Sequence, residues 1–497
     1  MKKFIIALSA LILLYLAYDT ARYRLGWYID LKPDEPVTAF MTTDTQSIYM
    51  DRGSGPEPFI VKGVNLGVGL PGEWATDYAI DRETYLRWFG QMQEMGANTV
   101  RVYITLHDDF YNAFYEYNTL REENGEEPLW LIHGVWVNDY VQNSHRDAYD
   151  KDFLDAFIED GRTLVDVLHG NKKISLGRGT GSGFYNKDVS RWVIGYILGV
   201  EWEDVTVAYT DHKYPDLPPY QGTYLSATED ASAFESMLAQ AGDRIIEYES
   251  RRYKSQRLVA FSNWPTTDPF LYPEDITTFF MKCAQVDVEH IRAEDAFLAG
   301  QFVSYHVYPY YPDYLNYSLN PAVMDRTPIW DGKAVISRVE TGPGTPISEL
   351  LRQEDFYDET GAANTYLAYL RALRRHHTMP VVISEFGVST GRGMAQIGSE
   401  HLPQSGPYVR AGAGAGARGL LARHHRGKLR GRLRLYLAGR VVQAHLEHHA
   451  RGESPAHAVL ERLSDQRAVF RSALLRPRRE GKRLLCGRRP LGVDGGG

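Results

Sequence analysis

The sequence predicts an α/β protein built as a (β/α)8 barrel, in which seven of the eight strands are recognisable. From Phe59 onward, short apolar runs alternate with longer amphipathic stretches, as repeated strand–helix units require. The runs are apolar at successive positions, which is typical of strands buried on both faces of a parallel sheet. Two of these runs are followed by a glutamate, Glu201 in one case and Glu385 in the other.

The predicted strands follow one another along residues 59–384. The first is Phe59–Asn65 and the second is Asn98–Ile104, and a helix over Glu83–Met95 lies between them with its aromatic residues on one face. The other five strands are Leu129–Trp136, Trp192–Leu198, Leu258–Ser262, Phe302–Tyr308 and Pro380–Ser384. Seven strands leave a closed barrel one strand short.

The composition changes after residue 404, where the missing strand should follow. Between Ser405 and Gly497 there is no Trp, Ile, Met, Asn or Thr. This segment is either a low-complexity basic tail or, as we favour, the product of a frameshift in a GC-rich gene. Residues 431–449, reverse-translated with suitable codons and read from the second base, can give Ala-Gly-Ser-Val-Phe-Thr-Trp, a strand ending in Trp. We therefore expect the eighth strand to be lost to the frameshift, the tail to make few contacts, and this polypeptide to be poorly folded and inactive.

The N-terminus predicts export from the cytoplasm. Lys2 and Lys3 precede an apolar run from Phe4 to Ala17, a pattern typical of signal sequences. No clean cleavage site follows, so we favour a membrane-anchored protein with its barrel outside the cytoplasm, and a secreted protein is the alternative. The predicted organisation is a signal anchor or signal peptide (1–22), a polar lead-in (23–54), a barrel domain (55–404) and the basic tail (405–497).

Composition narrows the function classes. The net charge of −8 argues against nucleic acid as a partner. With only Cys283 and Cys486, neither a disulfide framework nor a cysteine-based zinc site is indicated, and the adjacent His376 and His377 lack metal-ligand spacing. We therefore expect no metal and no cofactor. The 33 Tyr and 9 Trp supply rings of the kind that sugar-binding clefts use.

Glu201 and Glu385 have the placement that glycoside hydrolysis requires. Glu201 follows the fourth predicted strand and Glu385 ends the seventh, so a barrel brings both to its C-terminal face. Retaining hydrolysis needs two carboxyl groups about 5–5.5 Å apart, one to donate a proton and one to attack the anomeric carbon. We predict Glu201 as the acid/base and Glu385 as the nucleophile, with Glu203 as the alternative acid/base.

Four motifs carry a family resemblance between Phe59 and Gly391. They are Lys62-Gly-Val-Asn65, Met95-Gly-Ala-Asn-Thr-Val-Arg101, Tyr305-His-Val-Tyr-Pro309 and Ser384-Glu-Phe-Gly387. With them the chain resembles the clan A retaining glycoside hydrolases, most closely the barrel domain of the family 2 type. The resemblance implies that Arg101 lies beside the nucleophile and that Tyr308 or His306 hydrogen-bonds Glu385. One residue departs from the clan, because Val200 stands where an Asn usually bonds the sugar 2-hydroxyl.

Three tryptophans, Trp136, Trp202 and Trp264, stand at or just after strand ends. Each is interpreted either as a platform for substrate sugars or as a plug in the core of a loop. His133, within the third strand, and Asp139, after it, are weaker subsite candidates. The loop 177–183 is rich in glycine but lacks the Gly-Lys-Ser/Thr ending of a phosphate loop, so we expect a flexible loop beside the cleft.

The resulting hypothesis is a retaining β-glycosidase that acts by double displacement on an extracytoplasmic or cell-envelope polysaccharide or oligosaccharide. Val200 motivates an alternative, a non-catalytic glycan-binding or exopolysaccharide-assembly protein on a degenerate barrel. A third possibility is a transmembrane scaffold that uses the basic tail to bind a partner.

Overall fold

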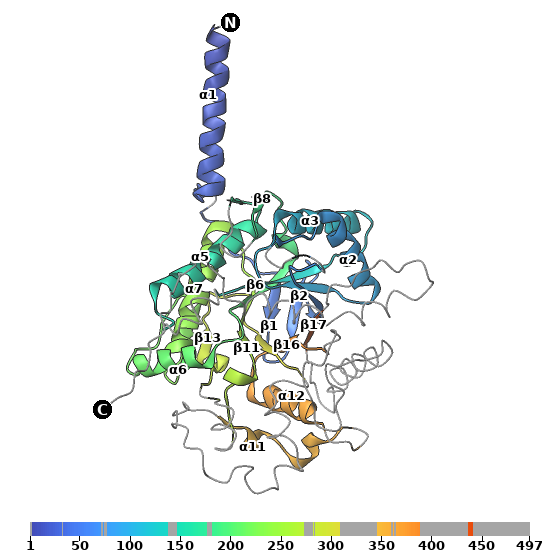
Figure 1. Cartoon of the computed structure of the whole chain (residues 1–497), viewed down its shortest axis with the longest axis vertical. Coiled ribbons are helices and arrows are strands. Elements are labelled where there is room, and N and C mark those ends of the chain that lie inside the picture. Colours follow the sequence, from blue (N-terminus) through green and yellow to red (C-terminus); the bar gives the residue numbers. More distant parts are fainter. Residues whose placement is uncertain are drawn as a thin grey trace, which may run out of the picture.

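Parallel strands close into a barrel at the centre of the molecule, with helices around it (Figure 1). The structure is a computed structural model that describes residues 2–31, 33–70, 73, 77–137, 147–175, 181–272, 282, 284–308, 345–358, 361, 364–387 and 436–440. Neighbouring barrel strands follow the order β11-β14-β16-β17-β4-β5-β6-β9. The (β/α)8 barrel predicted from the sequence is therefore confirmed.

The seven predicted strands are all present in the barrel. They are β4 (Lys62–Leu66), β5 (Thr99–Val102), β6 (Trp130–Val135), β9 (Val193–Leu198), β11 (Leu258–Asn263), β14 (Val303–His306) and β16 (Val381–Glu385). The first begins later than predicted, because Phe59 ends a different strand, β3 (Pro56–Phe59), where it pairs with Ile48. Nearly every residue of these strands is buried, as their continuous apolar sequences require.

An eighth strand, β17 (Tyr436–Arg440), occupies the position between β16 and β4. It runs parallel to both neighbours, with Leu437 opposite Ile383 on one side and Lys62 on the other. Our expectation that the tail supplies no strand is therefore wrong for these five residues. The gap left by seven strands accepts a short extended segment, and this one closes the barrel. The open strand edges from which we expected a poorly folded, inactive polypeptide are therefore absent among the described strands, and the later predictions assume a folded chain. The rest of residues 405–497 lies outside the described residues, and its origin in a shifted frame stays a prediction.

Helices lie between successive strands and cover the barrel. They are α2 (Arg82–Glu94), α3 (Asp108–Glu123), α5 (Lys151–Leu168), α6 (Asp204–Lys213), α7 (Ala233–Tyr253), α11 (Ile347–Leu350) and α12 (Thr365–His376). Side chains cap several of their N-termini: Asp81 accepts from the Thr84 amide, and Ser232 forms a reciprocal capping box with Glu235. Short 3-10 turns are η3 (Ser190–Trp192), η4 (Pro265–Thr267), η5 (Val288–His290) and η6 (Gln353–Phe356).

A small antiparallel sheet of β1 (Met41–Thr43), β2 (Ile48–Asp51) and β3 covers the N-terminal end of the barrel. Met41 and Ile48 are buried in the same core as the barrel strands, and Thr43 contacts the position of Gly300, just before β14. Part of the predicted lead-in therefore belongs to the barrel domain. Three further strand pairs are β7 (Lys172–Ile174) with β8 (Gly183–Tyr185), β10 (Leu225–Ala227) with β13 (Ile291–Ala293), and β12 (Phe270–Leu271) with β15 (Thr345–Pro346).

The N-terminal helix α1 (Lys2–Asp19) projects from the barrel with none of its residues buried (Figure 1). It continues into one turn of π-helix, η1 (Thr20–Arg24). Residues Lys2–Arg24 are long and apolar enough to cross a membrane, a property that a signal sequence shares.

Candidate active site

The two predicted carboxylates meet at the C-terminal end of the barrel. Glu385 is the last residue of β16, and Glu201 lies three residues beyond the end of β9. The turn after β9 depends on Gly199, whose φ of +96° is a left-handed conformation that glycine adopts without strain. A Cβ at this glycine would lie 2.1 Å from the Trp202 ring, so the absence of a side chain also makes room for that ring. This packing determines where the loop presents Glu201.

Glu385 is buried and receives two donors of different kinds. The hydroxyl of Tyr308 donates to Oε2 at 2.7 Å, and Nη1 of Arg101 lies 3.3 Å from Oε1. The Arg101 and Glu385 side chains are 2% and 6% exposed, so the pair is shielded from water. A cation and a hydroxyl donor both favour the ionised carboxylate, which is the form a nucleophile needs. The geometry agrees with the roles that the family resemblance implies for Arg101 and Tyr308.

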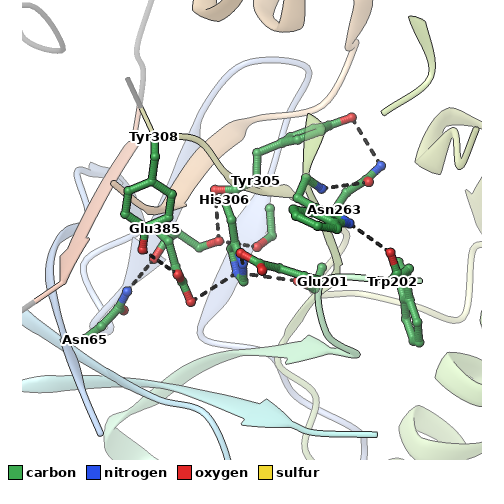
Figure 2. Close-up of polar contacts among 12 residues, drawn as sticks. Asn65, Glu201, Trp202, Asn263, Tyr305, His306, Tyr308 and Glu385 are labelled. Atoms are coloured by element: carbon green, nitrogen blue, oxygen red, sulfur yellow. Dashed lines mark hydrogen bonds and ion pairs between the residues drawn. The ribbon is translucent and has the colours of Figure 1, made fainter. Parts of the chain in front are cut away.

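His306 lies between the two glutamates (Figure 2). Its Nε2 is 3.3 Å from Nη2 of Arg101, and its Nδ1 is 3.2 Å from Oε1 of Glu201. A guanidinium can only donate, so in the tautomer that carries its proton on Nδ1 the ring accepts from Arg101 at Nε2 and donates to Glu201 from Nδ1. In that tautomer a hydrogen-bond chain runs from Arg101 through His306 to Glu201. Whereas the resemblance offered Tyr308 or His306 as the donor to Glu385, the structure gives that bond to Tyr308.

The separation of the carboxyl groups fits one stereochemical outcome. One oxygen of Glu201 and one of Glu385 lie within 4.8 Å of each other, with a nitrogen of His306 within the same distance of both. Retaining enzymes hold the two groups about 5–5.5 Å apart, whereas inverting enzymes need about 6.5–9.5 Å to admit a water. Glu201 is also the more open of the two, with 26% of its side chain exposed. A proton donor that must meet a leaving group and then water needs such access.

Two residues that sequence reasoning did not single out complete the site. Asn65, at the end of β4, donates from Nδ2 to the Ser384 carbonyl at 2.8 Å, and its own Oδ1 has no hydrogen-bond partner in the described part of the chain. Ser262, near the end of β11, places Oγ 3.5 Å from Nε2 of His306. Both stand at C-terminal ends of predicted strands, and that position was the signal that could have identified them.

Of the two roles considered for Trp202, the structure favours the plug in the core of a loop. Its side chain is fully buried, and its ring packs edge-on against Phe157 and Phe234. A ring with no exposed face cannot stack on a sugar, so Trp202 is a plug in the loop core and the prediction that it binds substrate is wrong. Its position beside Gly199 explains why an aromatic side chain follows Glu201 in the sequence.

The other two tryptophans keep a partly open surface. Trp136 meets Tyr103 edge-on, with ring centres 6.1 Å apart, and the Tyr103 ring lies 4.5 Å from the guanidinium of Arg101. Trp264 donates from Nε1 to the Trp202 carbonyl at 2.9 Å. Both are half-buried near the predicted carboxylates, and their role as sugar platforms stays a prediction.

The structure distinguishes among the remaining residues that the sequence singled out. Glu203 is exposed and precedes α6, and it is Glu201 that bonds His306, so the geometry favours Glu201 as acid/base. His133 is a core residue: Tyr111 and the Gly134 carbonyl occupy its ring nitrogens, and burial lowers its pKa to about 3. Val200 is buried and offers no hydrogen bond to a sugar. Asp139 and most of the 177–183 loop lie outside the described residues.

Two groups among the described residues bring three possible metal-ligand atoms within 4.8 Å of one another. The first is Glu201, His306 and Glu385, the trio described above. The second is Asp287, His376 and His377, in which Asp287 already pairs with Nε2 of His376 at 2.7 Å. Both groups are accounted for by hydrogen bonds and ion pairs, so we assign a metal to neither.

Comparison with known proteins gives distant structural likeness. No protein-family model matches the sequence, and no curated protein sequence matches it. Similar solved structures include β-glucuronidase 2 of Bacteroides uniformis bound covalently to cyclophellitol-6-carboxylate aziridine, with 11% identity over 80% of this chain and a TM-score of 0.37. The endo-1,4-β-mannanase of Rhizomucor miehei aligns with 87% of this chain and 99% of its own, at 14% identity and a TM-score of 0.42.

An endo-laminarinase from Formosa aligns with 81% of this chain and 82% of its own, at 9% identity and a TM-score of 0.36. The aligned part spans 32% of the length of the Bacteroides uniformis glucuronidase 2 chain. At these identities and scores the likeness assigns neither an activity nor a substrate. The barrel topology and the geometry of the two glutamates therefore carry the functional argument.

Proposed function

We propose that this chain is a retaining β-glycoside hydrolase that cleaves an extracytoplasmic or cell-envelope polysaccharide or oligosaccharide. The observation that carries the proposal is the pairing of Glu201 and Glu385, whose nearest oxygens lie within 4.8 Å at the C-terminal end of a (β/α)8 barrel. Arg101 and Tyr308 supply Glu385 with a cation and a hydroxyl donor, contacts that favour a carboxylate, and partial exposure leaves Glu201 accessible to a leaving group. The four motif resemblances support the same assignment.

The reaction divides into two displacements. In the first, a carboxylate oxygen of Glu385 attacks the anomeric carbon, the bond to the leaving oxygen breaks, and Glu201 gives that oxygen its proton. The product is a glycosyl ester on Glu385. In the second, Glu201 takes a proton from water, the water oxygen attacks the anomeric carbon, and the ester bond breaks to restore the Glu385 carboxylate. Two inversions at the same carbon give net retention.

The His306 contact suits Glu201 to both steps. In the tautomer that donates from Nδ1, the ring bonds one Glu201 oxygen and leaves the other oxygen to carry or receive the transferred proton. Val200 supplies no contact for a sugar 2-hydroxyl. The substrate therefore either has that hydroxyl bound by another group or carries a modified 2-position.

The test uses azide as a replacement for each glutamate in turn, with aryl β-glycosides as substrates. Glu385→Ala should abolish turnover, and added azide should attack the anomeric carbon directly to give an α-glycosyl azide. With Glu201→Ala, azide should instead attack the glycosyl ester and give the β-glycosyl azide. Glu203→Ala is the matched control and should keep the parent activity. Full activity of the Glu385→Ala variant would sink the assignment.

A non-catalytic glycan-binding protein is the second candidate, favoured by Val200 alone. It predicts glycan binding without hydrolysis, with an affinity that Glu201→Gln leaves unchanged. The hydrolase predicts turnover that Glu201→Gln abolishes. Measuring both binding and release of sugar on the same glycan separates the two.

A further inference from the structure

The segment that follows α1 is bonded to the side of the barrel. Arg22 donates from Nε and Nη2 to Oδ1 of Asn171, at 3.1 and 2.7 Å, and Arg24 donates to Oγ of Ser175 at 3.0 Å. The ring of Tyr23 packs edge-on against Phe184 in β8, with ring centres 5.0 Å apart. The single turn of η1 therefore contacts the β7–β8 hairpin and the residues beside it, and Figure 1 shows β8 near the base of α1.

A second set of contacts fixes the chain after η1. Arg252, near the end of α7, donates to the Gly26 carbonyl and is itself held by Asp166, whose Oδ1 lies 3.3 Å from Nε of the arginine. Both charged side chains are nearly buried, at 5% and 2% exposed. Gly26 has a φ of +68°, a turn that brings its carbonyl onto this pair. The guanidinium also lies over the ring of Tyr28 at 4.8 Å, and Lys254 pairs with Asp30 at 2.9 Å.

The helix beyond these contacts matches a bilayer. Its 18 residues span about 27 Å at 1.5 Å each, close to the roughly 30 Å of a hydrocarbon core. Lys2 and Lys3 stand at one end, and at the other the exposed rings of Tyr15, Tyr18 and Trp27 are of the kind that lies at head-group level. The helical conformation is continuous through Arg24, so no extended segment separates the apolar run from the docked residues.

We propose that residues 2–30 form a permanently retained membrane stem that is rigidly seated on the barrel, rather than a cleaved signal peptide or a flexible tether. In this arrangement α1 lies in the bilayer, and residues 19–30 hold the β7–β8 side of the barrel against the lipid head groups. The buried pair of Asp166 and Arg252 binds the stem through the Gly26 carbonyl. This inference is independent of the proposed chemistry.

The seating also positions the catalytic end. The end of the loop between β7 and β8 reaches the rim after β5: Gly181 donates to the Thr105 carbonyl at 2.7 Å, and Ser182 donates to Nδ1 of His107 at 2.7 Å. The same hairpin therefore joins the stem to the rim that follows Arg101. A rigid stem would hold this rim at a fixed place above the membrane, which restricts the enzyme to glycan segments that reach the bilayer surface.

The experiment places the full chain in lipid nanodiscs that contain phosphatidylglycerol and measures how fast trypsin releases the barrel by cutting after Arg22 or Arg24. Residues that are bonded to the barrel should resist cleavage by trypsin. Arg252→Ala should speed release by about tenfold or more, because the stem then detaches from the barrel more easily. Arg251→Ala is the matched control: its exposed side chain pairs with Glu247 one turn away, and release should stay at the parent rate. Gly26→Ala alters the same contact from the stem side and should also speed release. It replaces Arg252→Ala in the test if that variant fails to fold.

Two results would overturn the proposal. The first is an intact mass, for protein purified from the membranes of an expression host, that shows a chain beginning after about residue 17. The second is a parent protein that trypsin releases as fast as the Gly26→Ala variant, with both barrels folded by thermal melting. Retention of residues 2–18 together with slow release in the parent supports it. Failure of either test leaves the hydrolase proposal intact, because its azide test does not use the stem.

Discussion

Glu385 carries the charge on which the proposed reaction depends, and its neighbours divide the work of holding that charge. Tyr308 gives a short hydrogen bond to Oε2, whereas Arg101 lies at a longer 3.3 Å from Oε1 and also contacts His306. The tyrosine therefore orients one oxygen of Glu385. The positive charge of Arg101 lies beside both Glu385 and His306, the residue that contacts Glu201. At the residue scale, loss of one donor should weaken the site without dismantling it.

Tyr308→Phe should lower kcat/KM by about 10- to 100-fold, because a hydrogen bond to a charged group contributes about 1.5–3 kcal/mol. Tyr366→Phe is the control: its hydroxyl bonds the nearby Val307 carbonyl at 3.3 Å and touches neither glutamate in the contacts described. Steady-state kinetics on one aryl glycoside compares the two. Equal losses in both variants would mean that the effect is structural and that Tyr308 has no special role.

The residues at strand ends were predictable, and the residues that act through tertiary packing were not. Glu201 and Glu385 could be identified because a parallel barrel gathers the C-terminal ends of its strands. Arg101 and His306 were identified from the motifs that resemble those of the clan A glycoside hydrolases. Trp202 also follows a strand end, yet its ring packs against Phe157 and Phe234, which come from two distant helices. Sequence spacing cannot reveal that packing, and for this reason the sequence left the platform and plug interpretations of Trp202 both open.

At the scale of elements, the β9 turn links the core to the chemistry. Gly199 allows the Trp202 ring to pack against the backbone, and that ring anchors the loop that carries Glu201. Along the chain, the strand β9 is followed by the turn at Gly199 and then by the buried ring of Trp202. Any side chain at residue 199 would disturb both the turn and the plug.

Gly199→Ala should reduce the free energy of unfolding by about 1–3 kcal/mol, the usual cost of a strained backbone position, and should reduce activity further by displacing Glu201. Gly90→Ala is the control, since a Cβ there meets no atom within 4 Å and alanine favours the helix. Urea unfolding and kcat are measured for both variants. Unchanged activity in a folded Gly199→Ala protein would show that the turn does not position Glu201.

The contact between η5 and α7 makes stability depend on pH. Glu235 accepts from Nδ1 of His290 at 2.7 Å and raises the pKa of His290 to about 9. Because the pKa is raised in the folded state, this stabilisation is fully present below about pH 6.5, the pKa of an unfolded histidine. It is lost as the pH rises through about 9. His376 and His377 hold the pKa values of Asp287 and Glu289 below their usual range, so those carboxylates stay ionised across this window.

The urea concentration at the unfolding midpoint of the parent protein should therefore decrease as the pH is raised from 6.5 to 9.5. His290→Gln keeps a hydrogen-bonding side chain without a titrating group, so its midpoint should fall less over the same range. A His290→Gln variant with the full parental slope would show that another group titrates in this window.

At the scale of the whole molecule, the barrel depends on a strand from the basic tail. The seven strands between Lys62 and Glu385 were predictable from their uninterrupted apolar sequences, and their bounds differ from prediction by a few residues at most. The sheet of β1, β2 and β3 was not, because Pro56 and Pro58 mask an edge strand in a polar, turn-rich region. Neither was β17, since composition alone gave no reason to expect order within residues 405–497.

Leu437→Pro tests whether the tail closes the barrel. An interior strand bonds to both neighbours, so a proline there removes a ladder hydrogen bond and should lower the free energy of unfolding by about 2 kcal/mol or more. Leu437→Val preserves the strand and should change stability little. An unchanged unfolding curve for Leu437→Pro would restore the expectation that the tail contributes nothing, and sequencing the codons for Pro403 to Arg410 would then decide whether the frame is shifted.

The most direct test of the central claim is to trap the covalent intermediate. A panel of 2-deoxy-2-fluoro glycosides with good leaving groups slows the second displacement more than it prevents the first, so the glycosyl ester accumulates and can be mapped by peptide mass spectrometry. The account predicts one fluoro-sugar per chain, attached to the peptide that contains Glu385, and no label in Glu385→Ala. A label on Glu201 or on any other residue, or turnover that inverts the anomeric configuration, would contradict it.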